Sequence, residues 1–154
     1  MGVYFECVTR MTVDRAVLFD LSRSIDAHAA SLARSRERAV AGVTTGLISL
    51  DQQVTWRAWH LGLPIRMTSR ITDMSAPDLF VVEQVRGPFR SFRHAYEFEE
   101  DGGETVMTER VEFAAPFGVL GRAVERLVLA RYMFGLVRIR NEYLLGDALV
   151  SFDG

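Results

Sequence analysis

Three residues with acid–base side chains occupy alternating positions in two neighbouring strand patterns: His94 and Tyr96 in one, Glu109 in the next. Because alternate residues of a strand point to one face, the side chains of His94 and Tyr96 are expected about 6–7 Å apart. A carboxyl group buried between Met107 and Val111 would have a raised pKa. Glu109 is therefore a candidate general acid, or a general base once it is paired with a histidine. The alternative is that His94 and Glu109 have structural roles only.

These residues lie within a series of stretches in which apolar and polar residues alternate, the pattern of half-buried strands. The expected strands are Val3–Met11, Arg38–Thr44, Leu47–Leu50, Val54–Leu61, Ile65–Asp73, Leu79–Arg86, Phe89–Glu99 and Thr105–Ala114. Asp101-Gly102-Gly103-Glu104 is typical of a hairpin turn between the last two. Between the first two strands the sequence predicts two short helices, one capped by Thr12 or Asp14 and one within Ser22–Ala33.

The longest helical pattern runs from Pro116 to Gly146. Its apolar residues recur at steps of three and four, which places them on one side of a helix; they are Leu120, Ala123, Leu127, Ala130, Phe134, Val137 and Leu144. A second apolar stripe, Leu129, Met133, Leu136 and Tyr143, falls on the far side, interrupted by Arg122, Arg126 and Arg140. Loops or arginine stems would cover this stripe, or it forms a homodimer contact through Leu129, Met133 and Leu136, or the helix moves to admit a ligand.

The order of elements predicts an α+β fold. We expect a curved antiparallel sheet of about seven strands, with two short helices after the first strand and one long C-terminal helix across the sheet. The length suits a single domain over 1–154, with a core at about 3–146 and a tail at 147–154. A gap between a curved sheet and the helix that it grips is a natural ligand site.

The stretch from Ser69 to Arg122 resembles bacterial members of the superfamily of START-like, Bet v 1-like and polyketide cyclase/dehydrase domains, known as SRPBCC. The points of likeness are Ser69-Arg70-Ile71, Pro77 with Phe80-Val81, Gly87-Pro88-Phe89, the Phe92–His94 pair, Gly103 with Thr105 and Met107-Thr108, Pro116, Leu120-Gly121, Arg131-Tyr132 and Arg140-Asn141. The resemblance covers about residues 3–146 and implies the helix-grip fold. It also implies an apolar or aromatic small-molecule ligand, in some members with cyclase or dehydratase chemistry.

Three functions remain open at this point, one of them an interaction protein that dimerises or docks through Leu129, Met133 and Leu136; the other two concern a small molecule. The first is binding of an apolar, aromatic or lipid-like molecule between the sheet and the long helix. The expected ligand contacts are Trp56, His60, Phe92, His94, Tyr96, Phe98, Glu109, Phe113, Leu127 and Phe134. The second is a cyclase or dehydratase in which His94, Tyr96 and Glu109 transfer protons. His28, in the second short helix, lies either on the surface or at the mouth of the cavity.

Composition excludes several other classes of function. A net charge of -2 argues against a nucleic-acid partner, and no apolar run is long enough for an integral membrane segment. The N-terminus does not read as a signal peptide, so a cytoplasmic protein is expected. Cys7 is the single cysteine, and no histidine or cysteine cluster has metal spacing. We therefore expect neither a metal nor any other cofactor.

Overall fold

The structure is a computed structural model that describes residues 2–116, 118, 123 and 128–152. The strands are β1 (Val3–Met11), β2 (Arg38–Gly42), β3 (Gln53–His60), β4 (Leu63–Ser75), β5 (Leu79–Arg86), β6 (Ser91–Asp101) and β7 (Glu104–Ala114). The helices are α1 (Arg15–Ser22), α2 (Ile25–Ser31), the short 3₁₀ turn η1 (Ala33–Ser35) and α4 (Ala130–Phe152).

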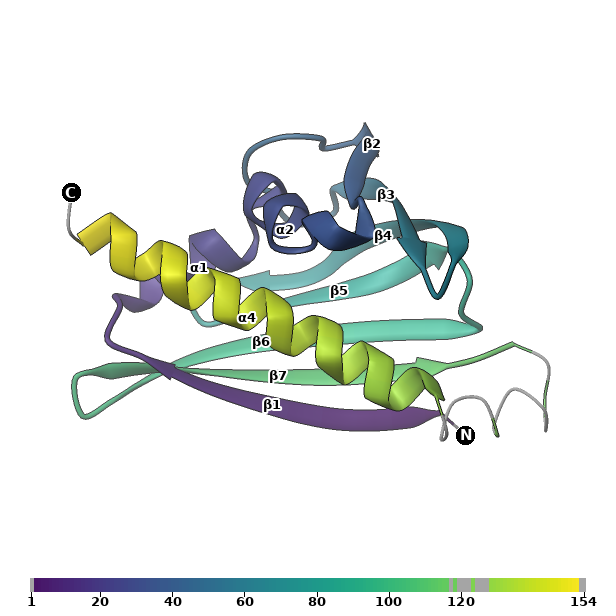
Figure 1. Cartoon of the computed structure of the whole chain (residues 1–154). Helices are drawn as coiled ribbons and strands as arrows, with labels where there is room; N and C mark the ends of the chain where they lie inside the picture. The colour runs from purple at the N-terminus through teal and green to yellow at the C-terminus, as the bar shows by residue number, and fades with distance from the viewer. Residues whose placement is uncertain (1, 117, 119–122, 124–127, 153–154) are drawn as a thin grey trace.

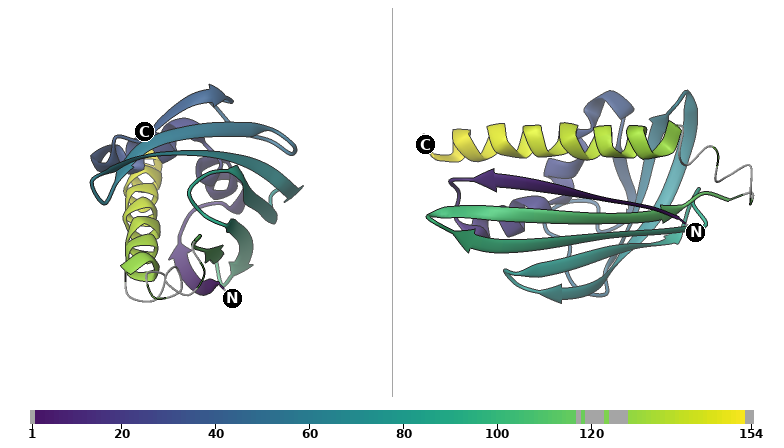
Figure 2. Two further views of the ribbon diagram at one scale, coloured as in Figure 1. Left: turned by 90° about the vertical axis from the view of Figure 1, so that its right-hand side faces the viewer. Right: turned by 90° about the horizontal axis from the view of Figure 1, so that it is seen from below.

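Within the described residues, seven antiparallel strands form one sheet in the order β1-β7-β6-β5-β4-β3-β2. Figure 1 shows α4 crossing one face of this sheet, with α1 and α2 on the same side. The sheet curves around the helix, as the two further views in Figure 2 show. The predicted α+β helix-grip architecture is confirmed, including the two short helices and the long C-terminal one.

The first turns of α1 and α2 are fixed by side chains that accept hydrogen bonds from free backbone amides. Asp14 accepts from the amides of Ala16 and Val17 at the start of α1. Ser24 does the same for Ala27 in α2. The second helix therefore spans only Ile25–Ser31 of the predicted Ser22–Ala33 range.

Two predicted elements are wrong in their bounds. The long helix predicted at Pro116–Gly146 does not end at Gly146, because α4, which spans Ala130–Phe152, continues beyond it. Residues 117, 119–122 and 124–127 of the predicted range lie outside the described residues. The predicted strand Leu47–Leu50 is reduced to one isolated bridge between Leu47 and Ser24.

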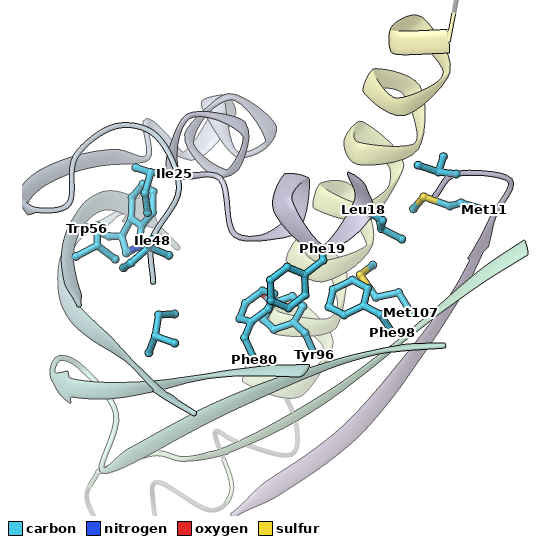
Figure 3. Close-up of a cluster of buried hydrophobic side chains, with 13 residues drawn as sticks. Met11, Leu18, Phe19, Ile25, Ile48, Trp56, Phe80, Tyr96, Phe98 and Met107 are labelled. Carbon is cyan, nitrogen blue, oxygen red and sulfur yellow. The ribbon is translucent and has the colours of Figure 1, made fainter. Parts of the chain in front are cut away.

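The main core lies where α1 and α2 meet the concave face of the sheet (Figure 3). The ring of Phe19, from α1, packs edge-on against Phe80 and Phe98, with 5.4 Å between ring centroids in each pair. Phe80 in turn stacks on Tyr96 at 4.2 Å. This aromatic cluster fixes the side chain of Tyr96 and thereby one wall of the space beneath α4.

Candidate functional site

A pocket of about 350 Å³ lies between the concave face of the sheet and α4. Strands β3 to β6, helix α2 and the first half of α4 all contribute to its lining. Most of the lining side chains are apolar, and they include Ile48, Trp56, Met67, Ile71, Phe80, Val82, Phe92, Leu129, Met133 and Leu136. A site of this size and composition matches small-molecule pockets in general, which are mostly apolar with a few polar groups.

Three of the four residues in the second apolar stripe of the long helix face this pocket, and the fourth, Tyr143, is exposed. Leu129, Met133 and Leu136 are part of the pocket wall and are only partly exposed. These three residues therefore face other parts of the same chain. Their apolar character no longer argues for the predicted homodimer contact.

The sheet and α4 are joined by polar side chains around the carboxylate of Glu109, which is 0% exposed. Arg140 Nη1 donates to Glu109 Oε1 at 3.0 Å, and Asn141 Nδ2 donates to Oε2 at 2.7 Å. His94 Nε2 lies 3.4 Å from the same Oε1. Arg140 also donates through Nη2 to the backbone oxygen of Ser22 at 2.8 Å. One arginine thus connects α4, β7 and the end of α1.

The proton positions in this network follow from the arginine, which can only donate. Arg140 Nη1 donates to the hydroxyl oxygen of Tyr96 at 2.8 Å, so the Tyr96 proton is free to bond to His94 Nδ1, 3.3 Å away. A neutral His94 then carries its own proton on Nε2, directed toward Glu109. The rings of His94 and Tyr96 stack at 4.0 Å.

The protonation states agree with this arrangement. Burial alone would raise the pKa of Glu109, but its contacts with His94 and Asn141 and the positive charge of Arg140 lower it below its ordinary value. Burial lowers the pKa of His94, and the positive charge of Arg140 lowers it further. Burial raises the pKa of Tyr96. At neutral pH the site therefore holds a carboxylate, a neutral imidazole and a protonated phenol.

The expectation that burial would make Glu109 a general acid is therefore wrong. Its pKa moves down, because His94 from β6, followed by Arg140 and Asn141 from α4, stabilises the charged form. Glu109 is also absent from the pocket lining, whereas His94, Tyr96 and Arg140 are part of it. The carboxylate acts on the pocket through these three side chains and positions them.

The predicted ligand contacts other than Glu109 divide into four groups. Trp56, His60 and Phe92 line the pocket together with His94 and Tyr96. Phe98 and Phe113 are buried in the core without lining it. Leu127 lies outside the described residues. Phe134 is 37% exposed and packs edge-on against Phe5 at 5.5 Å, so its expected place in the pocket is wrong.

Sequence reasoning did not predict the places that two residues of α4 have in this site. Arg140 was expected on the far side of the helix, but it is 3% exposed and faces the sheet. Asn141 was noted only as part of the resemblance. A signal did exist, because both residues lie three or four positions from the buried Val137 and Leu144. Polar residues inside such a stripe indicate a buried polar site on the helix.

A second polar cluster lines another part of the pocket: Glu37, His28, His60 and Tyr132. Glu37 Oε1 lies 3.5 Å from His28 Nε2, and Oε2 lies 3.5 Å from His60 Nε2. The other nitrogen of His60, Nδ1, lies 2.7 Å from the hydroxyl of Tyr132 in the first turn of α4. The ring of His28 lies 4.5 Å from that of Trp56.

Sequence reasoning missed Glu37, and no signal in the sequence marks it. It stands between Arg36 and Arg38 in a strongly charged segment, which is typical of an exposed surface. The backbone at Arg36 takes a left-handed conformation, with φ of +53°, immediately before Glu37. The Glu37 side chain itself lies in the pocket wall and is 8% exposed.

Neither cluster is arranged around a metal. In the part of the chain that the structure describes, no group of three or more histidine, cysteine, aspartate or glutamate side chains is placed to hold a metal ion. The two histidines of the second cluster approach different oxygens of Glu37 and do not converge on one point. Across the same residues, no helix is long and apolar enough to cross a membrane.

Solved structures of the same fold cover nearly the whole chain. The crystal structure of TTHA0849 from Thermus thermophilus has a TM-score of 0.78 at 12% identity, covering 97% of this chain and 99% of that one. The Zhui aromatase/cyclase from a Streptomyces species has a TM-score of 0.76 at 11% identity, covering 96% and 94%. A START superfamily protein from Mycobacterium smegmatis has a TM-score of 0.69 at 11% identity, covering 94% and 96%.

These structures define the class of fold. The chain has the helix-grip fold of the SRPBCC type, shared by START-like proteins and an aromatase/cyclase, and the fold predicted from the sequence resemblance is confirmed. No protein-family model and no curated protein matches the sequence. At these low identities the likeness establishes the fold and leaves function to the site.

Proposed function

We propose that this protein binds an apolar, ring-containing or lipid-like small molecule in the pocket between its sheet and α4, and that residues 1–154 act as one binding domain. The observation that carries this proposal is the pocket of about 350 Å³ itself, with its mostly apolar wall. Such a volume is at the lower end of those that hold drug-sized molecules. The sequence resemblance to START-like and Bet v 1-like domains, which implies an apolar or aromatic small-molecule ligand, supports the same function.

The polar network around Glu109 supports a preformed pocket. Arg140 and Asn141 bond α4 to the carboxylate on β7, and Arg140 also bonds to the end of α1. These contacts hold α4 at a fixed position over the sheet. The space between α4 and the sheet therefore does not have to be filled by apolar side chains of the protein. A ligand that enters a preformed site loses less free energy to reorganisation of the protein.

A fluorescence titration with N-phenyl-1-naphthylamine, a neutral apolar probe, tests this function. The wild-type protein should enhance the probe's emission with a saturable, one-to-one curve. Leu136→Trp places a larger ring in the pocket wall and should weaken binding at least tenfold. Ile139→Trp, at an exposed position on the same helix, is the matched control and should bind like the wild type. Equal binding by both variants would contradict the proposal.

A second candidate function is proton-transfer catalysis of the cyclase or dehydratase type. The observation that favours it is the pair of donors on the pocket wall, because Arg140 donates to a Tyr96 hydroxyl that lines the same pocket. Such a pair can stabilise negative charge that develops on a carbonyl oxygen. The general base that this reaction needs is less evident. Both ring nitrogens of the candidate base, His94, face protein groups, Tyr96 and Glu109.

Hydrogen–deuterium exchange separates the two candidates. An enolisable ring ketone such as 2-tetralone is incubated with the protein in D₂O, and exchange of its acidic C–H protons is followed by NMR. An enzyme of this type would accelerate exchange at least tenfold over buffer, and His94→Gln would abolish the acceleration. Binding of the ketone without faster exchange would leave ligand binding as the function.

A further inference from the structure

The same order of side chains, tyrosine, histidine and glutamate, occurs twice at the pocket; Glu109 lies behind the wall and Glu37 is part of it. In the first array, Tyr96 contacts His94 Nδ1 and His94 Nε2 faces Glu109. In the second, Tyr132 contacts His60 Nδ1 and His60 Nε2 faces Glu37. The two arrays come from different elements, β6 and β7 in one case, and α4, β3 and the segment before β2 in the other.

The arrays differ in how their carboxylates are satisfied. Both oxygens of Glu109 accept short hydrogen bonds, from Arg140 at 3.0 Å and Asn141 at 2.7 Å. The ion-pair contacts of Glu37 among the described residues are with two histidines, each at 3.5 Å and longer than an ordinary hydrogen bond. The Oε2 atom of Glu37 is buried, and among the described residues it has no hydrogen-bond partner.

The charge of Glu37 also depends on a small number of partners. Among the described residues, only His28 and His60 lie within ion-pair distance of it, and neither carries a permanent charge. Burial works to raise the pKa of Glu37, but the two histidines together lower it to about 2. A buried carboxylate whose oxygens lack short hydrogen bonds costs free energy unless a donor reaches it, and Glu37 lines the pocket, from which a donor can come.

From this geometry we propose that Glu37 receives a hydrogen bond from a donor group, a hydroxyl or an amine, on the ligand that occupies the pocket. The inference rests on the proposed binding function and narrows its ligand class. The ligand has an apolar body with a donor at one end, and a carboxylate at that end is repelled by Glu37. The ring of Trp56, beside His28, provides a flat apolar surface next to this donor position.

A matched series of naphthalenes tests the donor requirement. Each compound displaces N-phenyl-1-naphthylamine at pH 7: 2-naphthol and 2-(aminomethyl)naphthalene offer a donor, 2-methoxynaphthalene offers only an acceptor, and 2-naphthoate carries a negative charge. A hydrogen bond to a charged group predicts that 2-naphthol binds about tenfold more tightly than 2-methoxynaphthalene. The naphthoate should be the weakest competitor, and the amine should show whether a cation is preferred to a neutral donor.

Glu37→Gln removes the charge at nearly constant shape, and Glu37→Asp keeps the charge but withdraws it from the pocket. Both variants should reduce the preference for naphthol over the methoxy compound to less than threefold while still binding the probe. Glu99→Gln, at an exposed position on β6, is the charge-matched control and should keep the wild-type preference.

The outcomes separate this inference from the function on which it rests. If the wild type binds the probe but does not distinguish naphthol from methoxynaphthalene, the role of Glu37 is wrong and the pocket stands. The same conclusion follows if Glu37→Gln keeps the full preference. If the probe does not bind the wild type at all, the proposed binding function itself fails.

Discussion

Arg140 and Glu109 form an ion pair with 3.0 Å between Nη1 and Oε1, and the two residues are 3% and 0% exposed. The pair connects α4 to β7 across the layer in which the pocket lies. Because both charges are removed from water, each depends on the other and on its further hydrogen bonds. The position of α4 over the sheet is therefore tied to this contact.

Replacing the arginine should leave the carboxylate buried without its charge partner. Arg140→Met is expected to lower the free energy of unfolding by about 3–5 kcal/mol. Adding Glu109→Gln removes the stranded charge, so the double variant should be more stable than Arg140→Met alone. Urea denaturation followed by circular dichroism measures all of these values.

The control for this prediction lies on the exposed side of the same helix. Arg138 lies 3.6 Å from Glu142 in a solvent-exposed pair, and Arg138→Met should change the free energy of unfolding by less than about 0.5 kcal/mol. A loss of similar size for Arg138→Met and Arg140→Met would show that the buried pair has no special role.

Stability should fall in two stages as the pH is lowered. The pKa of His94 is below its ordinary value of 6.5, so the unfolded chain binds more protons there as the pH drops below 6.5, which favours unfolding. The pKa values of Glu37 and Glu109 lie below 4.5, so their stabilisation is present above 4.5 and is lost below it. Each group contributes at most about 1.4 kcal/mol per pH unit.

Thermal unfolding at pH values of about 7, 5.5 and 4 separates these stages. The melting temperature of the wild type should fall over both intervals. His94→Gln should be less sensitive between pH 7 and 5.5 and should still lose stability between 5.5 and 4. If the melting temperature of His94→Gln falls as much between pH 7 and 5.5 as that of the wild type, His94 is excluded as the cause of that fall.

Phe80 belongs both to the core and to the pocket wall, since it is 1% exposed and also lines the pocket. Phe80→Ala should lower the free energy of unfolding by about 3–5 kcal/mol. The space vacated joins the pocket, so an apolar ligand should restore more stability to this variant than it adds to the wild type.

Phe98→Ala is the matched control, because Phe98 belongs to the same aromatic cluster but does not line the pocket. It should be destabilised to a similar extent, and N-phenyl-1-naphthylamine should raise its melting temperature no more than that of the wild type. Equal recovery of both alanine variants would mean that the cavity at position 80 is not continuous with the pocket.

The fold follows from patterns that a sequence displays directly. Alternation in stretches such as Val54–Leu61 specifies one buried face per strand, and Asp101-Gly102-Gly103-Glu104 specifies the hairpin that sets Tyr96 directly opposite Glu109. The same alternation places His94 and Tyr96 on the concave face. Local sequence patterns were sufficient to predict these features, because each feature depends on residues that are close together in the chain.

The chemistry of the site was less predictable, because it depends on partners distant in sequence. Glu109 was expected to have a raised pKa from its apolar neighbours on β7. His94 on β6 and the α4 residues Arg140 and Asn141, more than thirty positions later, reverse the direction. Glu37 reaches the pocket through a left-handed turn at Arg36 that no local pattern indicates.

The account depends most on one claim, that an apolar ligand with a donor group occupies the pocket between the sheet and α4. A crystal structure of the protein with 6-bromo-2-naphthol, using the anomalous signal of bromine, locates such a ligand directly. The account predicts a single bromine peak inside the pocket wall formed by Trp56 and Leu136, with the hydroxyl within hydrogen-bond distance of Glu37. A saturating ligand whose bromine lies outside that wall would contradict it.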